Sequence, residues 1–401
     1  MSGIKQNKQG LKVLAAGSLL QLFLGIMYVW SVFVAPVSVY YSWEAGDVRL
    51  TFSFMLCFFV IGILIGGKFQ PKIGVKITTL AGGLMVAAGI LATAFIPANS
   101  NAPVFLIYLF YGVIGGFGVG MAYNSIISSV QKWFPKNRGF ATGVVVCAFG
   151  ASTVIFAPVV TALNGIFEVN ITLLLLSGVF ATATLVLFSF IQTPEQIQST
   201  AMPQISGRQY TTLEMIQTLR YYLITLSLML GTSVFFIIQP SLNSLAVDRN
   251  LADFATYLVM FTGIANALGR LGAPLLSDKI GRESADIVIL LATSLGAFGL
   301  CFAEGPLLIV IIAVVAFCFG GYSGLYPVLT SENFGIKYIG SNYGAVMVGF
   351  MLSALVFPVF LNRIDNQEVR FIILGVLAAI GAVLIFILKM INVKIQKEAN
   401  A

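Results

Sequence analysis

The stretch Phe371–Leu388, FIILGVLAAIGAVLIFIL, contains no charged side chain and no hydrogen-bonding side chain. A helix needs roughly 20 predominantly apolar residues to cross a hydrocarbon core about 30 Å thick. With its flanking residues, this stretch is long enough to be a transmembrane helix. Its continuous apolar character argues against a barrel strand, which is about ten residues long and alternates apolar and polar side chains.

Comparable runs recur along the whole chain and predict twelve transmembrane helices. The run 77–131 is too long for one helix, and a segment bounded by Pro97 and Pro103 divides it into two. The run 254–277 is interrupted only by Arg270. The remaining charge-free runs are 13–44, 50–67, 139–167, 169–194, 221–247, 287–303, 305–331 and 338–362.

The composition agrees with an all-α membrane protein. Of the 401 residues, 58% are hydrophobic and 9% are charged, and the mean hydropathy is +0.97, whereas a soluble domain has about 25% charged residues. The chain has no histidine, and its four cysteines lie in predicted spans without C-x-x-C spacing. We therefore expect no metal site, no cofactor and no disulfide framework. The sequence also lacks the phosphate-loop and nucleophile-elbow motifs that would indicate an enzyme.

The basic residues are concentrated in alternate loops. If the N-terminus is cytoplasmic, 17 of the 22 Lys and Arg residues lie on the inner side. By the positive-inside rule, both termini are then cytoplasmic, and we expect a multi-pass, monomeric protein of the cell membrane in contact with the lipid bilayer. The net charge of +7 follows from this bias and does not indicate nucleic-acid binding, because the basic residues are scattered over many loops.

A polar segment divides the predicted helices into two groups of six. We expect residues 193–220 to form a cytoplasmic linker between a bundle at 1–192 and a bundle at 221–401. The end of this linker, Thr211–Glu214 (TTLE), fits a capping box and predicts a short helix.

Two inner loops match at a half-chain offset and indicate an internal repeat. Lys72–Lys76 reads KIGVK, and Asp278–Arg282 reads DKIGR. A duplicated six-helix unit places the substrate path between the two halves, near the middle of the membrane.

Arg270 is the strongest functional signal. It precedes Asp278, at the inner end of its helix, by eight residues, or about 12 Å at 1.5 Å per residue. A guanidinium at that depth costs at least about 2.5–3.5 kcal/mol. The Asp and Glu residues map to predicted loops, tails or helix ends, so we expect a negatively charged substrate to be its partner. The alternative is a structural ion pair.

Other residues are candidates for the same site. Asn266 lies one turn before Arg270 and can bond to the guanidinium or to the substrate, although packing is an alternative. Aromatic rings provide an apolar wall and hydroxyls orient an anion; each such residue can also serve packing alone. These further candidates are Tyr28, Tyr123, Gln239, Tyr322 and Ser323.

Several motifs carry a family resemblance that covers essentially the whole chain. They are Tyr28–Trp30 (YVW), Lys132–Gly139 (KWFPKNRG), Asn266–Arg270 (NALGR) followed by DKIGR, Phe317–Pro327 and Asn342–Gly344 (NYG). Together they resemble the oxalate/formate antiporter family, which is related to the monocarboxylate transporters. The resemblance implies a major-facilitator fold and alternating access. It also implies a carboxylate bound at Arg270, with Asp278, Arg282 and Arg138 as gating residues.

Two positions depart from the family pattern. Phe350 stands where the oxalate carrier has a lysine, eight residues after the asparagine of the NYG motif. One cation then matches one carboxylate. Asn266 stands where proton-coupled monocarboxylate carriers often have an aspartate. This departure disfavours coupling through a protonated Asp or Glu side chain and leaves a proton that travels with the substrate or through water as the alternative.

The sequence thus predicts a secondary transporter of a small organic anion and favours a monocarboxylate such as lactate, pyruvate or formate. One alternative is an oxalate/formate-type exchanger. A second is a proton-coupled drug exporter of the same fold, although such carriers usually need an acid in the membrane. A third is a membrane sensor that binds an acid without moving it.

Overall fold

The fold is that of a computed structural model, which describes residues 2–98, 102–194, 208–239, 255–361 and 363–400, together with Leu242, Leu245 and Arg249. All regular structure in these ranges is helical, which confirms the all-α class. The middle of the expected linker, 195–207, lies outside the described residues.

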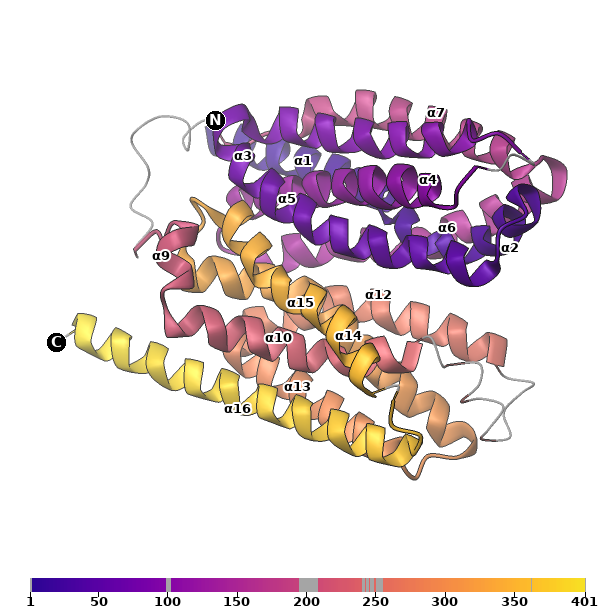
Figure 1. Cartoon of the computed structure of the whole chain (residues 1–401). Coiled ribbons are helices and arrows are strands. Elements are labelled where there is room, and N and C mark those ends of the chain that lie inside the picture. Colours follow the sequence, from indigo (N-terminus) through magenta and orange to yellow (C-terminus); the bar gives the residue numbers. More distant parts are fainter. Residues whose placement is uncertain are drawn as a thin grey trace. The chain divides into compact units, whose positions relative to one another are not determined.

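Figure 1 shows the order of the helices along the chain. The elements before the linker are α1 (Ser2–Leu24), η1 (Gly25–Val29), α2 (Trp30–Tyr41), α3 (Ala45–Ala94), α4 (Phe105–Ile107), η2 (Tyr108–Gly115), α5 (Gly116–Trp133), α6 (Arg138–Ile166), α7 (Val169–Leu187) and η3 (Phe188–Phe190). Those after it are α9 (Thr212–Ile216), α10 (Leu219–Ile238), α12 (Ala255–Ile280), α13 (Arg282–Gly299), α14 (Gly305–Phe334), α15 (Ile339–Leu361) and α16 (Gln367–Asn400).

These helices are consistent with the twelve predicted spans. Nine helical stretches among the described residues are long and apolar enough to cross a membrane. One of them, α3, consists of two helices that meet at a kink at Gly74. The helices α12 and α13 are not among these nine stretches, and α13 begins with charged residues. When α3 is counted as two helices and α12 and α13 are added, the number is consistent with twelve spans.

The two matching loops have the same backbone conformation. Gly74 has φ 84° and ψ 155°, and Gly281 has φ 89° and ψ 155°. This region of φ/ψ space is open essentially to glycine alone. The sequence repeat is therefore accompanied by a repeated sharp turn between neighbouring helices.

The expected capping box is confirmed. The Thr211 hydroxyl accepts from the Glu214 amide, and the Thr211 amide donates to the Glu214 carboxylate at 2.8 Å. Each side chain satisfies an amide that the first turn of α9 leaves without a helical partner. The box begins α9 just ahead of α10.

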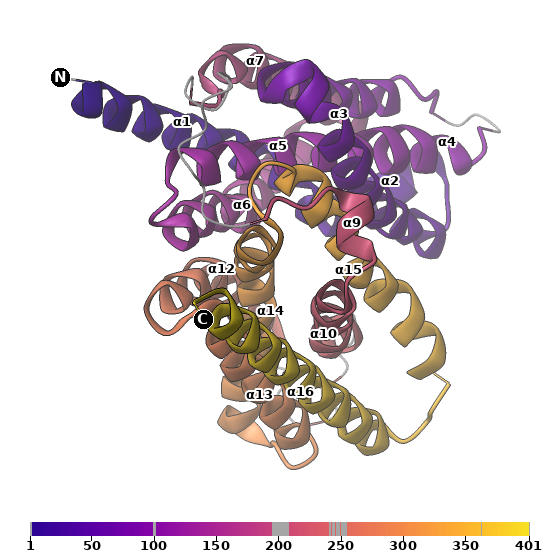
Figure 2. The ribbon, with the colours of Figure 1, turned by 90° about the vertical axis from the view of Figure 1, so that its left-hand side faces the viewer.

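The chain forms two compact units. The first comprises Met1–Lys136, Ala148–Arg208 and Tyr338–Gly344. The second comprises Asn137–Cys147, Gln209–Lys337 and Ala345–Ala401. The helices α6 and α15 therefore each contribute residues to both units. Within the first unit, α3 packs against α5 and α7; within the second, α12 packs against α14, and α13 packs against α14 and α16 (Figure 2).

The close contact of α12 with α14 depends on glycines. A Cβ on Gly320 would lie 2.0 Å from the carbonyl oxygen of Asn266, and one on Gly269 would lie 1.9 Å from that of Phe317. The two backbones therefore touch directly, as small residues allow in membrane helix pairs.

We predict that Gly320→Ala forces α12 and α14 apart. Overpacking of this kind costs about 1–3 kcal/mol, so the thermal midpoint of the purified protein in detergent should fall. The matched control is Gly263→Ala on α12, because a Cβ there meets nothing within 4 Å. Equal midpoints for the two variants would show that this contact is not tight.

Candidate functional site

Arg270 is buried within the second unit, although it carries a permanent charge. Its side chain is in the middle of α12 and is 2% exposed. Its Nε donates a hydrogen bond of 2.8 Å to Oδ1 of Asn266, one turn earlier. The structure thus brings these two predicted residues together, and the amide fixes one edge of the planar guanidinium.

The backbone around Arg270 is held from two sides. A Cβ on Gly324 of α14 would lie 2.4 Å from the Arg270 carbonyl oxygen. A Cβ on Gly143, from the part of α6 that belongs to the second unit, would lie 3.3 Å from the same oxygen. Close packing on both sides restricts movement of the α12 backbone at the arginine.

Phe350 belongs to an aromatic cluster in the second unit. Its ring centroid lies 5.0 Å from that of Phe236 on α10 and 5.9 Å from that of Phe319 on α14. Phe235 stacks on Phe319 at 3.9 Å. The cluster is an apolar wall built from three helices.

Three other predicted residues of the second unit have different surroundings. The Tyr322 hydroxyl forms a hydrogen bond of 2.7 Å with Thr293 of α13, and the residue is 1% exposed. Ser323 is partly buried and bonds to a carbonyl of its own helix, at Phe319. Gln239 is exposed and caps the C-terminus of α10. The structure therefore does not gather these side chains into one group.

Tyr28 and Tyr123 share a second aromatic cluster, in the first unit. The Phe149 ring lies 5.6 Å from Tyr28 and 4.9 Å from Tyr123, and Phe59 lies 5.2 Å from Tyr123. Tyr28 lies in the 3-10 segment η1, where a Cβ on Gly25 would meet the Phe149 carbonyl at 2.1 Å. The structure thus joins these two predicted tyrosines through Phe149.

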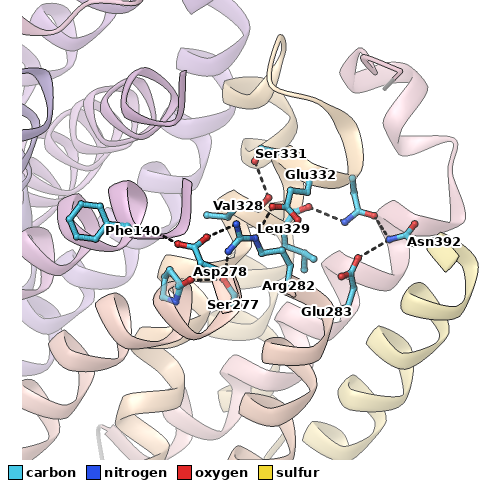
Figure 3. Close-up of polar contacts among 12 residues, drawn as sticks. Phe140, Ser277, Asp278, Arg282, Glu283, Val328, Leu329, Ser331, Glu332 and Asn392 are labelled. Atoms are coloured by element: carbon cyan, nitrogen blue, oxygen red, sulfur yellow. Dashed lines mark hydrogen bonds and ion pairs between the residues drawn. The ribbon is translucent and has the colours of Figure 1, made fainter. Parts of the chain in front are cut away.

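The predicted gating residues Asp278 and Arg282 form a charged cluster with Glu332 (Figure 3). Arg282 Nη2 lies 2.6 Å from Asp278 Oδ1, and Arg282 Nε lies 2.8 Å from Glu332 Oε1. Asp278 Oδ2 also accepts a hydrogen bond of 3.0 Å from the amide of Phe140, at the start of α6. The charged cluster therefore connects the ends of α12, α13 and α14 to the start of α6, one of the two helices that contribute residues to both units.

Arg138 lies beside the charged cluster. It is the first residue of α6, it is partly buried, and it interacts electrostatically with Glu332 and Arg282. The predicted gating residues thus lie in one neighbourhood of the second unit.

Three polar residues around this cluster are not among the predicted site residues: Glu283, Glu332 and Asn392. Glu332 lies in the last turn of α14, two residues before its end at Phe334. Asn392 of α16 donates to Glu283 at 2.8 Å and to Asn333 at 2.9 Å. These residues lie far apart in the sequence, and only the packing of α13, α14 and α16 brings them together.

Asp286 is the most important omission. The sequence places it near a helix end, next to the charged residues of the loop, whereas the structure puts it in the second turn of α13 with 0% exposure. Asp286 therefore lies near the end of its helix, as the sequence places it, but its side chain is buried, which the sequence analysis did not predict. Its position directly before the apolar run 287–303 is the sequence feature that pointed to burial.

Among the described residues, no group of three or more His, Cys, Asp or Glu side chains is placed to hold a metal ion. The predicted site residues supply a cation, amide and hydroxyl groups, and aromatic rings. Groups of these kinds have the chemistry to bind and orient an anion.

Known transporters resemble this chain over most of its length. The uncharacterized MFS-type transporter YhjX of Escherichia coli (strain K12) is 27% identical over 347 residues, covering 84% of this chain and 83% of that protein. The oxalate:formate antiporter of Oxalobacter formigenes is 26% identical over 354 residues, covering 86% and 81%. Human monocarboxylate transporter 12 is 24% identical over 373 residues, covering 83% and 70%.

A solved structure confirms the fold. The proton:xylose symporter XylE of E. coli, bound to 6-bromo-6-deoxy-D-glucose, superposes with a TM-score of 0.70 over 94% of this chain and 95% of that chain. The identity is 17%, so this likeness concerns the fold alone.

The family profile of the Major Facilitator Superfamily matches residues 15–358. The relatives it groups with are transporters and not enzymes. The chain therefore belongs to the Major Facilitator Superfamily and is a multi-span membrane transport protein.

Proposed function

We propose that this transporter carries a small organic anion with one carboxylate, of the lactate, pyruvate or formate class, and binds the carboxylate at Arg270. The observation that carries the proposal is the buried guanidinium in the middle of α12, oriented by Asn266. The planar fork of an arginine donates two parallel hydrogen bonds to a carboxylate. Hydrocarbon cannot solvate this charge, so an intramembrane arginine indicates a substrate or ion site.

The relatives support the same class of substrate. Two of the similar proteins are named for the transport of oxalate and formate and of monocarboxylates. At 24–26% identity, these names support an anion carrier but not a particular acid. The exchange of oxalate for formate is the second candidate function.

The aromatic residues favour one carboxylate over two. We propose that Phe350 and its aromatic neighbours line the substrate path on the second unit, and that Tyr28 and Tyr123 line it on the first. Aromatic rings suit the short apolar body of a monocarboxylate. A second carboxylate would need a second cation, and position 350 supplies a ring in its place.

We propose that the charged cluster is part of the gate on the cytoplasmic side, with both termini in the cytoplasm of a cell-membrane protein. Asp278 contacts the first turns of α6, whose remaining residues belong to the other unit. A bond at this point restrains a helix that both units share. Transport by alternating access requires such restraints to break and re-form.

Arg270→Ala should abolish the uptake of labelled lactate, pyruvate and formate into proteoliposomes. Removing one partner of a buried charge pair costs about 2–5 kcal/mol, or roughly thirtyfold or more in affinity. Arg270→Lys should also impair uptake, because a lysine lacks the planar fork. The control is Arg363→Ala, at an exposed position after α15. Normal uptake by Arg270→Ala would exclude this site.

Phe350→Lys should shift the preference toward dicarboxylates, because a second cation attracts a second carboxylate. The measurement is competition by unlabelled oxalate against uptake of a labelled monocarboxylate. Phe350→Leu is the matched control, since it removes the ring without adding charge. If oxalate competes equally well against both variants, Phe350 does not face the substrate.

Asp278→Ala should slow transport while leaving the half-saturation concentration nearly unchanged. The substitution removes the Arg282 ion pair and the acceptor of the Phe140 amide. A loss of about 1 kcal/mol changes a rate roughly fivefold. Asp365→Ala, in an exposed loop, is the control. A change confined to the half-saturation concentration would place Asp278 in binding and not in gating.

A further inference from the structure

The second unit contains a buried acid that the proposed anion site does not use. Asp286 is fully buried in α13, and neither carboxylate oxygen makes a hydrogen bond of standard geometry. The Tyr326 hydroxyl of α14 is near enough to interact with the carboxylate. An ionised carboxylate taken out of water without full hydrogen bonding costs several kcal/mol.

The positive charges nearby are engaged elsewhere. Arg282, one turn earlier on α13, is bound to Asp278 of α12 and Glu332 of α14. Lys389 of α16 donates to the Ser284 hydroxyl at 2.9 Å. Arg282 and Lys389, the two basic residues described here, therefore bind groups other than Asp286.

In the described part of the chain, two tyrosine hydroxyls and one further acid interact with Asp286. Tyr326 of α14 interacts with the carboxylate through its hydroxyl, and Tyr322 of α14 and Glu283 of α13 interact with it electrostatically. On α10, the neighbouring polar group is Ser227, which forms a hydrogen bond of 2.9 Å with the Tyr326 hydroxyl. Hydroxyls can both donate and accept, so they can bond to the carboxyl with or without its proton.

We propose that Asp286 is a proton-binding site whose loading and release are coupled to transport of the anion. In the binding step, a proton from water forms an O–H bond with one carboxylate oxygen, and the acid changes from negative to neutral. In the release step, the same bond breaks and the proton returns to water on the other side. One proton moving with one monocarboxylate transfers no net charge. This inference rests on the proposed function.

The packing connects the proposed proton site at Asp286 to the charged cluster and to Arg270. Asp286 follows Arg282 by one helical turn, so movement at the charged cluster also moves the acid. Its neighbours Tyr322 and Tyr326 stand on either side of Gly324, which touches the Arg270 backbone. The start of α13 and the middle of α14 therefore link the proton, the anion and the gate.

The test compares two assays in proteoliposomes with labelled pyruvate. The first is exchange against internal unlabelled pyruvate at equal pH, and the second is net accumulation driven by an inward proton gradient. Asp286→Asn keeps the shape of the side chain and imitates its neutral form. It should retain exchange and lose gradient-driven accumulation. Asp365→Asn, in an exposed loop, is the matched control and should retain both.

The proposal would be overturned if Asp286→Asn still accumulated pyruvate in response to the proton gradient. It would also be overturned if a variant of normal thermal stability lost exchange and accumulation to the same extent. If Asp286→Asn does not fold, Asp286→Glu decides the question: it should accumulate pyruvate with a shifted pH dependence, and an unshifted pH dependence would overturn the proposal. Exchange without gradient-driven accumulation in the wild-type protein would refute proton coupling and leave the anion carrier standing. Failure of wild-type exchange with every short acid would refute the proposed function itself.

Discussion

The burial of the Arg270 guanidinium is the constraint on which the rest of this structure depends, because hydrocarbon offers no solvation to a permanent charge. The protein meets the constraint with a hydrogen bond that Arg270 donates to Asn266 and with a rigid helix pair around the arginine. The backbones of α12 and α14 are in direct contact at Gly269, Gly320 and Gly324. A charge held this firmly is suited to repeated binding and release of an anion, because the site is already organised before the substrate arrives.

Three packed helices of the second unit carry the groups that we propose act in transport. Arg270 lies on α12, Asp286 lies on α13, and the two tyrosines that interact electrostatically with Asp286 lie on α14. The ion pairs of the charged cluster join the ends of these same three helices. Binding of an anion, binding of a proton and breaking of the cluster would therefore act on one packed group of helices. The first unit contains its own aromatic cluster around Phe149.

The spans were predictable because the membrane requires long apolar runs, and such runs are visible in the sequence without knowledge of packing. The capping box at Thr211 was predictable because it is a local contact. Asp286 was missed because its burial depends on Tyr326 and on the packing of α10, α14 and α16 around it. Glu332 and Asn392 were missed for the same reason. Tyr322 was placed in the right helix, but only the structure shows that its hydroxyl bonds to Thr293.

Direct binding of a labelled monocarboxylate to the purified protein tests the central claim most closely. We expect saturable binding of pyruvate to the wild-type protein, competed by unlabelled lactate and formate. We expect this binding to be lost in Arg270→Gln, a variant that keeps hydrogen-bond donors but removes the charge. Equal binding of pyruvate by the wild-type protein and a folded Arg270→Gln variant would show that Arg270 does not bind the carboxylate.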